Sequence, residues 1–118
     1  GHTVGHAFES FALKQNRPVL HGYAVAYGMV AELYMAHLKL QFPMELVEQL
    51  NEYVKRVYGS FEYAAADFDY LYETMTHDKK NQAGRINFTL LRNPGEVAIN
   101  IHCERHEVEE ALQYFIGK

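Results

Sequence analysis

The sequence predicts a mainly α-helical domain, a small helical bundle that carries one antiparallel β-hairpin. Most of the 118 residues repeat apolar side chains at every third and fourth position, which is the period of an amphipathic helix. Residues 85–102 instead alternate with a period of two on either side of an Asn-Pro-Gly turn. No internal repeat, low-complexity stretch or interdomain linker interrupts this pattern, so we expect one domain over residues 1–118.

The first two helices are expected over about residues 3–14 and 21–40. The apolar face of the first comprises Val4, Ala7, Phe8 and Phe11. Pro18 separates the two helices because proline cannot continue a helix. The second is apolar nearly all round as far as Ala36, which is typical of a buried central helix.

Three further helices and the hairpin follow. Pro43 fits the first turn of a third helix that runs to about Tyr58. A fourth helix starts at about Asp67 and is expected to end at the block 78–80, and a last one covers about residues 104–116. In the hairpin, each strand is expected to place one alternating set on a single face: Ile86, Phe88 and Leu90, then Val97, Ile99 and Ile101.

Composition and charge exclude several classes of protein. The net charge is −4, with 11 Lys and Arg residues against 15 Asp and Glu residues, which is the opposite of the balance that phosphate binding in nucleic acids requires. The longest uncharged apolar run, residues 23–31, is shorter than the roughly 18–20 residues that a membrane helix needs. Cys103 is the single cysteine, which suits a reducing compartment. We therefore expect a cytoplasmic protein with neither a nucleic-acid nor a membrane partner.

His2 and His6 lie one helical turn apart, on the side of the first helix opposite its apolar face. Glu9 falls on the same side. Two imidazoles at this spacing can converge on one metal ion. The alternative is a pair of surface histidines on an amphipathic helix, and the spacing alone favours that alternative because the glutamate of an HExxH motif is missing.

His21 stands at the start of the second helix, and the loop before it can fold it back towards the first helix. A charged histidine is unfavourable near a helix N-terminus, which favours a neutral, metal-binding imidazole over an ordinary helix-start residue. The block that contains Lys79 and Lys80 also has two interpretations. The lysines either form a solvated helix end, as the dipole favours, or bind a substrate phosphate or carboxylate.

Four blocks of the sequence together resemble the C-terminal domain of the 3-dehydroquinate synthase family. The blocks are GHTVGHAFE at residues 1–9, HGYAVAYGM at residues 21–29, DKK at residues 78–80, and FTLL at residues 88–91 with a Pro-Gly-Glu turn. Their order and approximate spacing hold over essentially the whole chain. Tyr23 stands where the family pattern has a glutamate.

The resemblance implies a two-domain enzyme in which this chain is the helical C-terminal half and an N-terminal domain, absent from this chain, binds NAD. His2 and His21 would then be ligands of a catalytic zinc ion, or of another divalent metal such as cobalt, with a glutamate of the N-terminal domain as the third ligand. His6 would lie by the substrate phosphate and help proton transfer. Lys79, or alternatively Lys80, would bind the substrate.

The implied activity is that of a lyase, which converts 3-deoxy-arabino-heptulosonate 7-phosphate into 3-dehydroquinate and phosphate in the shikimate pathway of aromatic amino acid biosynthesis. The full-length enzyme would be a cytoplasmic homodimer, and the isolated chain would be inactive. Three alternatives stay open: another sugar-phosphate cyclase, a metal-dependent polyol dehydrogenase of the same fold, and a non-catalytic helical interaction module. The GHTxGH and Asp-Lys-Lys blocks favour the synthase.

Overall fold

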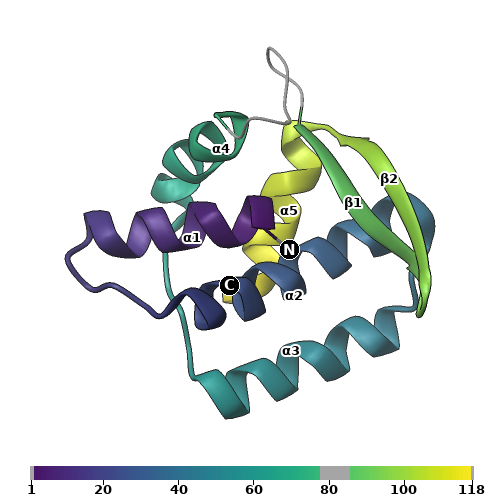
Figure 1. The fold of residues 1–118 in the computed structure, drawn as a ribbon, viewed down its shortest axis with the longest axis horizontal. Helices are drawn as coiled ribbons and strands as arrows, with labels where there is room; N and C mark the ends of the chain where they lie inside the picture. The colour runs from purple at the N-terminus through teal and green to yellow at the C-terminus, as the bar shows by residue number, and fades with distance from the viewer. Residues whose placement is uncertain (1, 78–85, 118) are drawn as a thin grey trace.

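The predicted mainly α-helical fold is confirmed by a computed structural model that describes residues 2–77 and 86–117. The described elements are α1 (His2–Lys14), α2 (His21–Leu40), α3 (Met44–Tyr58), a 3₁₀ turn (Ala65–Asp67), α4 (Phe68–Thr76), β1 (Ile86–Asn93), β2 (Glu96–Cys103) and α5 (Arg105–Ile116). α1 and α2 run in opposite directions and are joined by the loop at the left of Figure 1.

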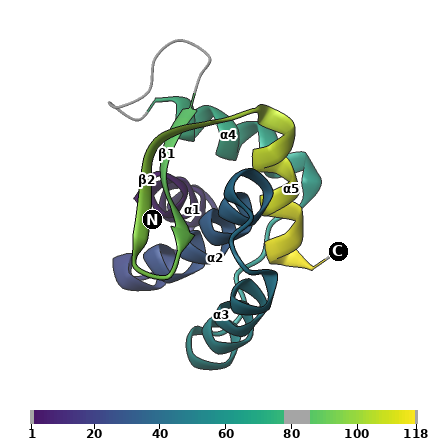
Figure 2. The ribbon, with the colours of Figure 1, turned by 90° about the vertical axis from the view of Figure 1, so that its right-hand side faces the viewer.

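α2 is the central helix of the molecule, as its nearly uniform apolar character predicted. α1, α3, α5 and β1 all pack against it. Figure 2 shows this arrangement along the length of the bundle, with α3 on one side of α2 and the hairpin on another. The four neighbours explain why α2 needs apolar side chains around most of its circumference.

An aromatic cluster fills the core beneath α1. The ring of Phe8 lies 5.2 Å from that of Phe61, 5.4 Å from Tyr63 and 5.7 Å from Phe115, measured between ring centroids. The buried Tyr63 hydroxyl donates a hydrogen bond to the carbonyl of Leu112 at 2.8 Å. The cluster therefore joins α1, the segment after α3, and α5 into one core.

α4 ends earlier than the sequence indicated. The Thr76 hydroxyl donates to the Glu73 carbonyl at 2.6 Å, and the amide of His77 no longer follows the α-helical hydrogen-bond pattern. That amide donates instead to Thr74 at 3.3 Å, in a tighter turn. The prediction that α4 reaches the Asp-Lys-Lys block is therefore wrong. The block itself lies outside the described residues.

The hairpin forms between β1 and β2 as predicted, with Gly95 at φ +84° in the turn. One detail of the prediction is wrong, because Val97 is 58% exposed and does not share a face with Ile101, which packs against the core. Phe88 pairs with Ile101 but Leu90 pairs with Ala98, so the register shifts by one residue between these pairs. A one-residue shift exchanges the two faces of a strand and turns Val97 outward.

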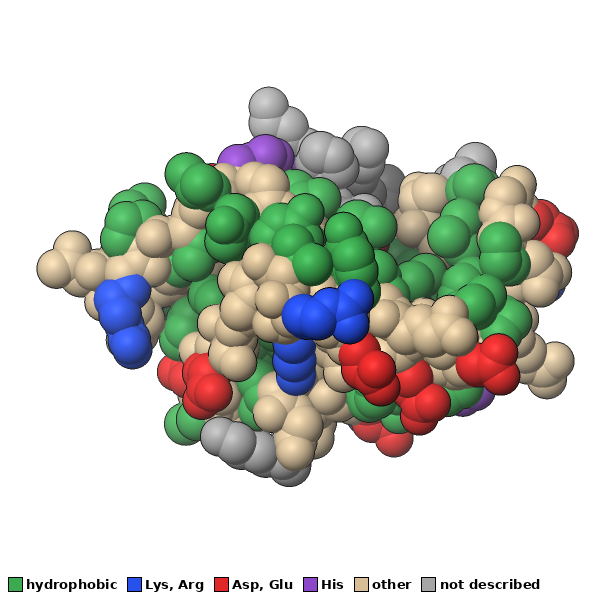
Figure 3. All heavy atoms as spheres, turned by 90° about the horizontal axis from the view of Figure 1, so that it is seen from below, with side chains coloured by type: hydrophobic (Ala, Val, Ile, Leu, Met, Phe, Trp, Pro, Cys, Tyr) green, Lys and Arg blue, Asp and Glu red, His purple; other side chains and the backbone are tan. Residues whose placement is uncertain are grey.

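Two surface properties agree with the composition. None of the helices in residues 2–77 and 86–117 is both long enough and apolar enough to cross a membrane. On the face drawn in Figure 3, the basic side chains are few and do not form a continuous patch, and acidic side chains lie near them. This face therefore offers no continuous basic surface for a phosphate backbone.

Candidate functional site

The candidate site lies where α1 meets the first turn of α2, and its described side chains are His6, Glu9 and His21. We call these three residues the α1–α2 seam. Val4, Ala7 and Phe8 are fully buried, whereas His6 on the opposite side of α1 is exposed. The predicted division of α1 into a core face and an outward polar face is thus confirmed for the described side chains.

Gly5 allows α1 to approach the backbone of α2 closely. A Cβ atom at this position would lie 3.3 Å from the carbonyl oxygen of Ala24 and 3.3 Å from the Cα atom of Val25. Such contacts are tighter than ordinary packing, and a backbone cannot swing away as a side chain can. Since Gly5 precedes His6 and Ala24 follows shortly after His21, this contact brings the two histidine-bearing segments together.

The side chain of Glu32, in α2, contacts the backbone of the first turn of α1. Its side chain is buried, with only 7% of the residue exposed, and it accepts a hydrogen bond from the backbone amide of Val4 at 3.4 Å. A buried carboxylate needs a hydrogen-bond partner, and the amide of Val4 supplies one. The buried carboxylate therefore stabilises the turn of α1 that carries His6.

His21 lies against the His6 and Glu9 side of α1, where we expected it. Its Nδ1 atom is 3.0 Å from Oε1 of Glu9, and its ring centroid is 6.1 Å from that of His6. The pair is accessible, with 54% of the His21 side chain and 39% of the Glu9 side chain exposed. Two motif blocks that are separate in the sequence thus form one open, polar site.

The other predicted site residues are not described by the structure to the same extent. α1 begins at His2, but the side chain of His2 lies outside the described part of the molecule, as do Lys79 and Lys80. Among the described residues, no group of three His, Cys, Asp or Glu side chains converges in a way that could hold a metal ion. The roles of His2, His6, His21, Lys79 and Lys80 therefore stay predictions.

Sequence reasoning placed Glu9 on the polar face of α1 but gave it no function, and it missed Glu32 altogether. A signal for Glu32 existed, because it is the only charged residue between residues 22 and 36 of an otherwise apolar helix. A single carboxylate in a buried helix requires a hydrogen-bond partner, and a backbone amide of a neighbouring helix is one.

Three apolar side chains at or near the N-terminal half of α2 are accessible. Leu20, Tyr23 and Met29 are all exposed. Tyr23, at the position where the family pattern has a glutamate, packs its ring edge-on against Tyr58 at 4.9 Å between centroids. Two turns after His21, Met29 lines a cleft of about 230 Å³ between α2 and β1, together with residues such as Leu33 and Leu90. The exposed apolar side chains of α2 therefore face α3 at Tyr23 and β1 at Met29.

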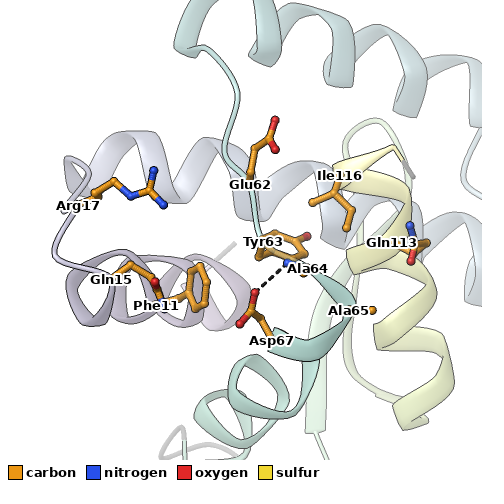
Figure 4. Close-up of a pocket in the computed structure, with 10 residues that line it drawn as sticks. All are labelled: Phe11, Gln15, Arg17, Glu62, Tyr63, Ala64, Ala65, Asp67, Gln113 and Ile116. Carbon is orange, nitrogen blue, oxygen red and sulfur yellow. Dashed lines mark hydrogen bonds between the residues drawn. The ribbon is translucent and has the colours of Figure 1, made fainter.

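A hollow of about 560 Å³ lies near the far end of α1. Figure 4 shows Phe11, Tyr63 and Ile116 around it, with Arg17 and Glu62 at one side. Its lining includes no residue of the α1–α2 seam. The charged Asp67 at its edge accepts a hydrogen bond from the amide of Ala64 at 2.8 Å, so its carboxylate stabilises the local turn. The hollow therefore does not compete with the seam as a chemical site.

Cys103 is not a candidate nucleophile or metal ligand. It is fully buried at the end of β2, and burial raises the pKa of its thiol to about 12. Because the thiolate is the reactive and metal-binding form, a thiol that stays protonated contributes neither function at neutral pH.

The fold and the seam define a class of protein: a helical domain that presents imidazole and carboxylate groups on an open face. The family model described as 3-dehydroquinate synthase C-terminal matches residues 1–81 of the chain. The chain therefore belongs to the 3-dehydroquinate synthase C-terminal family, which confirms the resemblance inferred from the sequence blocks.

Curated relatives give the same result. The chain is 50% identical to the 3-dehydroquinate synthase of Parabacteroides distasonis over 98% of its own length, which covers 33% of that protein. It is 38% identical to the 3-dehydroquinate synthase of Corynebacterium diphtheriae over 98% of its length and 30% of the relative. The synthase of Picrophilus torridus is 32% identical over 99% of the chain and 32% of the relative. The chain thus spans about a third of the length of these relatives.

Proposed function

We propose that this chain is the metal- and substrate-binding part of a 3-dehydroquinate synthase, which converts 3-deoxy-arabino-heptulosonate 7-phosphate into 3-dehydroquinate and phosphate. The observation that carries this proposal is the α1–α2 seam, where the two histidine blocks of the family pattern meet on one exposed face. The names of the relatives support the reaction.

One residue of the seam, His21, is suited to bind a divalent metal. Imidazole nitrogen is a preferred ligand of zinc, and the Nδ1 atom of His21 already faces a carboxylate, so a metal would bind through Nε2. His21 and His2 would hold the ion, and a glutamate of an N-terminal domain would complete the protein ligands. When bound, zinc or cobalt supplies a Lewis acid that polarises a substrate hydroxyl.

The remaining groups of the chain would act on the substrate directly. His6 is exposed beside His21, where its imidazole would exchange a proton with the substrate near the phosphate. The ammonium group of Lys79, or that of Lys80, would bind the phosphate or the carboxylate of the substrate. NAD would be bound by the N-terminal domain, which would cover the seam. We propose a cytoplasmic homodimer for the full-length enzyme.

A chimeric enzyme tests this function. The chain would replace the corresponding C-terminal third of the Parabacteroides distasonis synthase, and phosphate release would be assayed with NAD and zinc. We expect turnover by the chimera and none by the isolated chain. The His21→Ala chimera should lose bound zinc and activity but keep its helical circular dichroism. The His106→Ala chimera, altered at an exposed position of α5, should retain both.

The assay also separates the alternative functions. Folded chimera that binds NAD but releases no phosphate from this substrate would contradict the synthase proposal. Release of phosphate from a different sugar phosphate would indicate another cyclase, and NAD-dependent oxidation of a polyol without phosphate release would indicate a dehydrogenase. Robust turnover by the isolated chain would contradict the proposed division of the site between two domains.

A further inference from the structure

We propose that Glu9 is a positioning residue for His21, and that it fixes the tautomer and the ring orientation in which Nε2 of His21 faces the metal. This inference rests on the proposed function, because it assigns Glu9 a role towards the metal that His21 would bind. The observation behind it is the 3.0 Å contact between Oε1 of Glu9 and Nδ1 of His21.

The chemistry of the pair determines which nitrogen carries the proton. An ionised carboxylate can only accept hydrogen bonds, so Nδ1 of His21 must be the donor. A neutral imidazole with its proton on Nδ1 has its lone pair on Nε2, which is the form that binds a metal through Nε2. A carboxylate that accepts the second ring proton also makes the imidazole a stronger ligand.

Glu9 is well placed to hold the ring steadily because its neighbours in α1 are anchored. Phe8, before it, is fully buried in the aromatic cluster. Ser10, after it, is within hydrogen-bond distance of the Tyr70 hydroxyl at 2.7 Å, which ties α1 to α4. The backbone of Glu9 is therefore fixed from both sides, and its side chain reaches across to a residue of a different helix.

Because both side chains are accessible, the ion pair between Glu9 and His21 does not serve mainly to stabilise the fold. An ion pair between side chains that are 54% and 39% exposed contributes little to the free energy of folding. A hydrogen bond of the same geometry still restricts the imidazole to one tautomer and a narrow range of orientations. The Glu9–His21 pair is therefore suited to a positioning role, because a small interaction free energy is sufficient to favour one tautomer and one orientation of the His21 ring.

The experiment uses the 118-residue chain labelled with ¹⁵N. Long-range ¹H–¹⁵N spectra of the histidine rings report the tautomer of His21 directly, without metal and without activity. Titration with zinc chloride then gives an apparent dissociation constant from the shift of the His21 Nε2 resonance. In the unsubstituted chain we expect the Nδ1-protonated tautomer to predominate and zinc to shift the Nε2 resonance.

Glu9→Ala should remove the preference for the Nδ1-protonated tautomer and weaken zinc binding about tenfold to a hundredfold. Glu9→Gln keeps a carbonyl acceptor and should retain the tautomer with a smaller loss of affinity. Glu110→Ala removes the same charge from an exposed position of α5, so it controls for the general attraction between a negative protein and a cation. It should match the unsubstituted chain.

The outcomes distinguish this inference from the proposed function. If zinc leaves the His21 resonances unchanged in the unsubstituted chain and the chimera, which supplies the third ligand, also retains no zinc, the metal-binding role of His21 is wrong and the inference fails with it. If zinc binds to His21 but Glu9→Ala matches Glu110→Ala in both tautomer and affinity, the proposed function stands and the positioning role of Glu9 alone is overturned.

Discussion

The 13-residue helix α1 has two sides that differ in function: one packs into the core, and the other carries the residues of the candidate site. The inner side, composed of Val4, Ala7, Phe8 and Phe11, is buried in the core. The outer side carries His6 and Glu9, which are accessible and lie next to His21. Substitutions on the inner side should therefore change stability, whereas those on the outer side should change chemistry and leave stability almost unaffected.

This separation follows from the helical period, because residues four apart share a side and residues two apart do not. It explains how a family can keep its site fixed without making the site part of the core. Packing of the inner side fixes the position of α1. The residues of the outer side are thereby positioned as well, although they contribute little to packing. The predictions below test how complete the separation is.

The largest effect is expected at the centre of the inner side. Phe8→Ala removes a ring that contacts Phe61, Tyr63 and Phe115, and should lower the free energy of unfolding by about 3–5 kcal/mol. Leu13→Ala is the control, because Leu13 is 68% exposed on the same helix and should change stability by less than about 0.5 kcal/mol. Urea denaturation measures both. An equal loss of unfolding free energy for the two variants would show that the aromatic cluster does not dominate the packing of α1.

A partly buried ion pair at the other end of α2 should have an intermediate effect. Oε1 of Glu107, whose side chain is only 16% exposed, accepts from Lys39 Nζ at 3.1 Å and from the Glu104 amide at 2.7 Å. Burial alone would raise the pKa of Glu107, but the Glu104 amide and Lys39 outweigh it, so the pKa lies below its ordinary value of 4.5. Glu107→Gln should cost about 1–2 kcal/mol at pH 7.

The sign of the pH dependence follows from that lowered pKa. The stabilisation from Glu107 is fully present above the pKa of the unfolded chain and is lost as the pH falls from about 4.5 through the folded value. Urea midpoints measured between pH 7 and pH 3 should therefore fall less steeply for Glu107→Gln than for the unsubstituted chain. If the urea midpoints of the two proteins fall in parallel with pH, the Glu107 carboxylate does not contribute to stability as expected.

A smaller effect is expected at the boundary between the two sides, where Gly5 touches α2. Gly5→Ala adds a methyl group 3.3 Å from backbone atoms of Ala24 and Val25, and should destabilise the chain by about 1 kcal/mol despite the better helix propensity of alanine. Gly22→Ala is the matched control, since its added Cβ meets nothing within 4 Å. It should stabilise by about 0.4–1 kcal/mol. Thermal unfolding of both variants would show opposite shifts; a gain for Gly5→Ala would mean that α1 can move outward freely.

The smallest effect is expected on the outer side. His6→Ala and Glu9→Gln should each change the free energy of unfolding of the metal-free chain by less than about 0.5 kcal/mol, because their side chains are accessible and contribute little to packing. Chemical denaturation without zinc provides the measurement. A loss above 1 kcal/mol for either variant would show that the seam is a structural contact and that the two sides of α1 are not separate.

Much of the fold could be predicted because its signals are local. The periodic apolar residues located the helices to within a residue or two at most ends, and Pro94-Gly95 located the hairpin turn. The end of α4 could not be located, because residues 76–80 contain neither a glycine nor a proline to mark it. The outward turn of Val97 could not be predicted either, because a register shift depends on the pairing of two strands.

The candidate site shows the same limit. The position of His6 and Glu9 on one side of α1 follows from the helical period, and the prediction was confirmed. The approach of His21 to Glu9 depends on the close contact between Gly5 and the α2 backbone. No pattern in the sequence specifies a distance between two helices. The hydrogen bond, and with it the function proposed for Glu9, could only be found in the structure.

The central position of α2 also has a consequence for the motion of the site. Helices or strands pack on α2 from several directions, so its interior amides should exchange with deuterium only when the whole chain unfolds. His21 is an accessible side chain, yet it is attached to the first turn of this most persistent element. A ligand at the seam would therefore meet an imidazole whose backbone hardly moves between successive encounters, so little conformational entropy would be lost on binding.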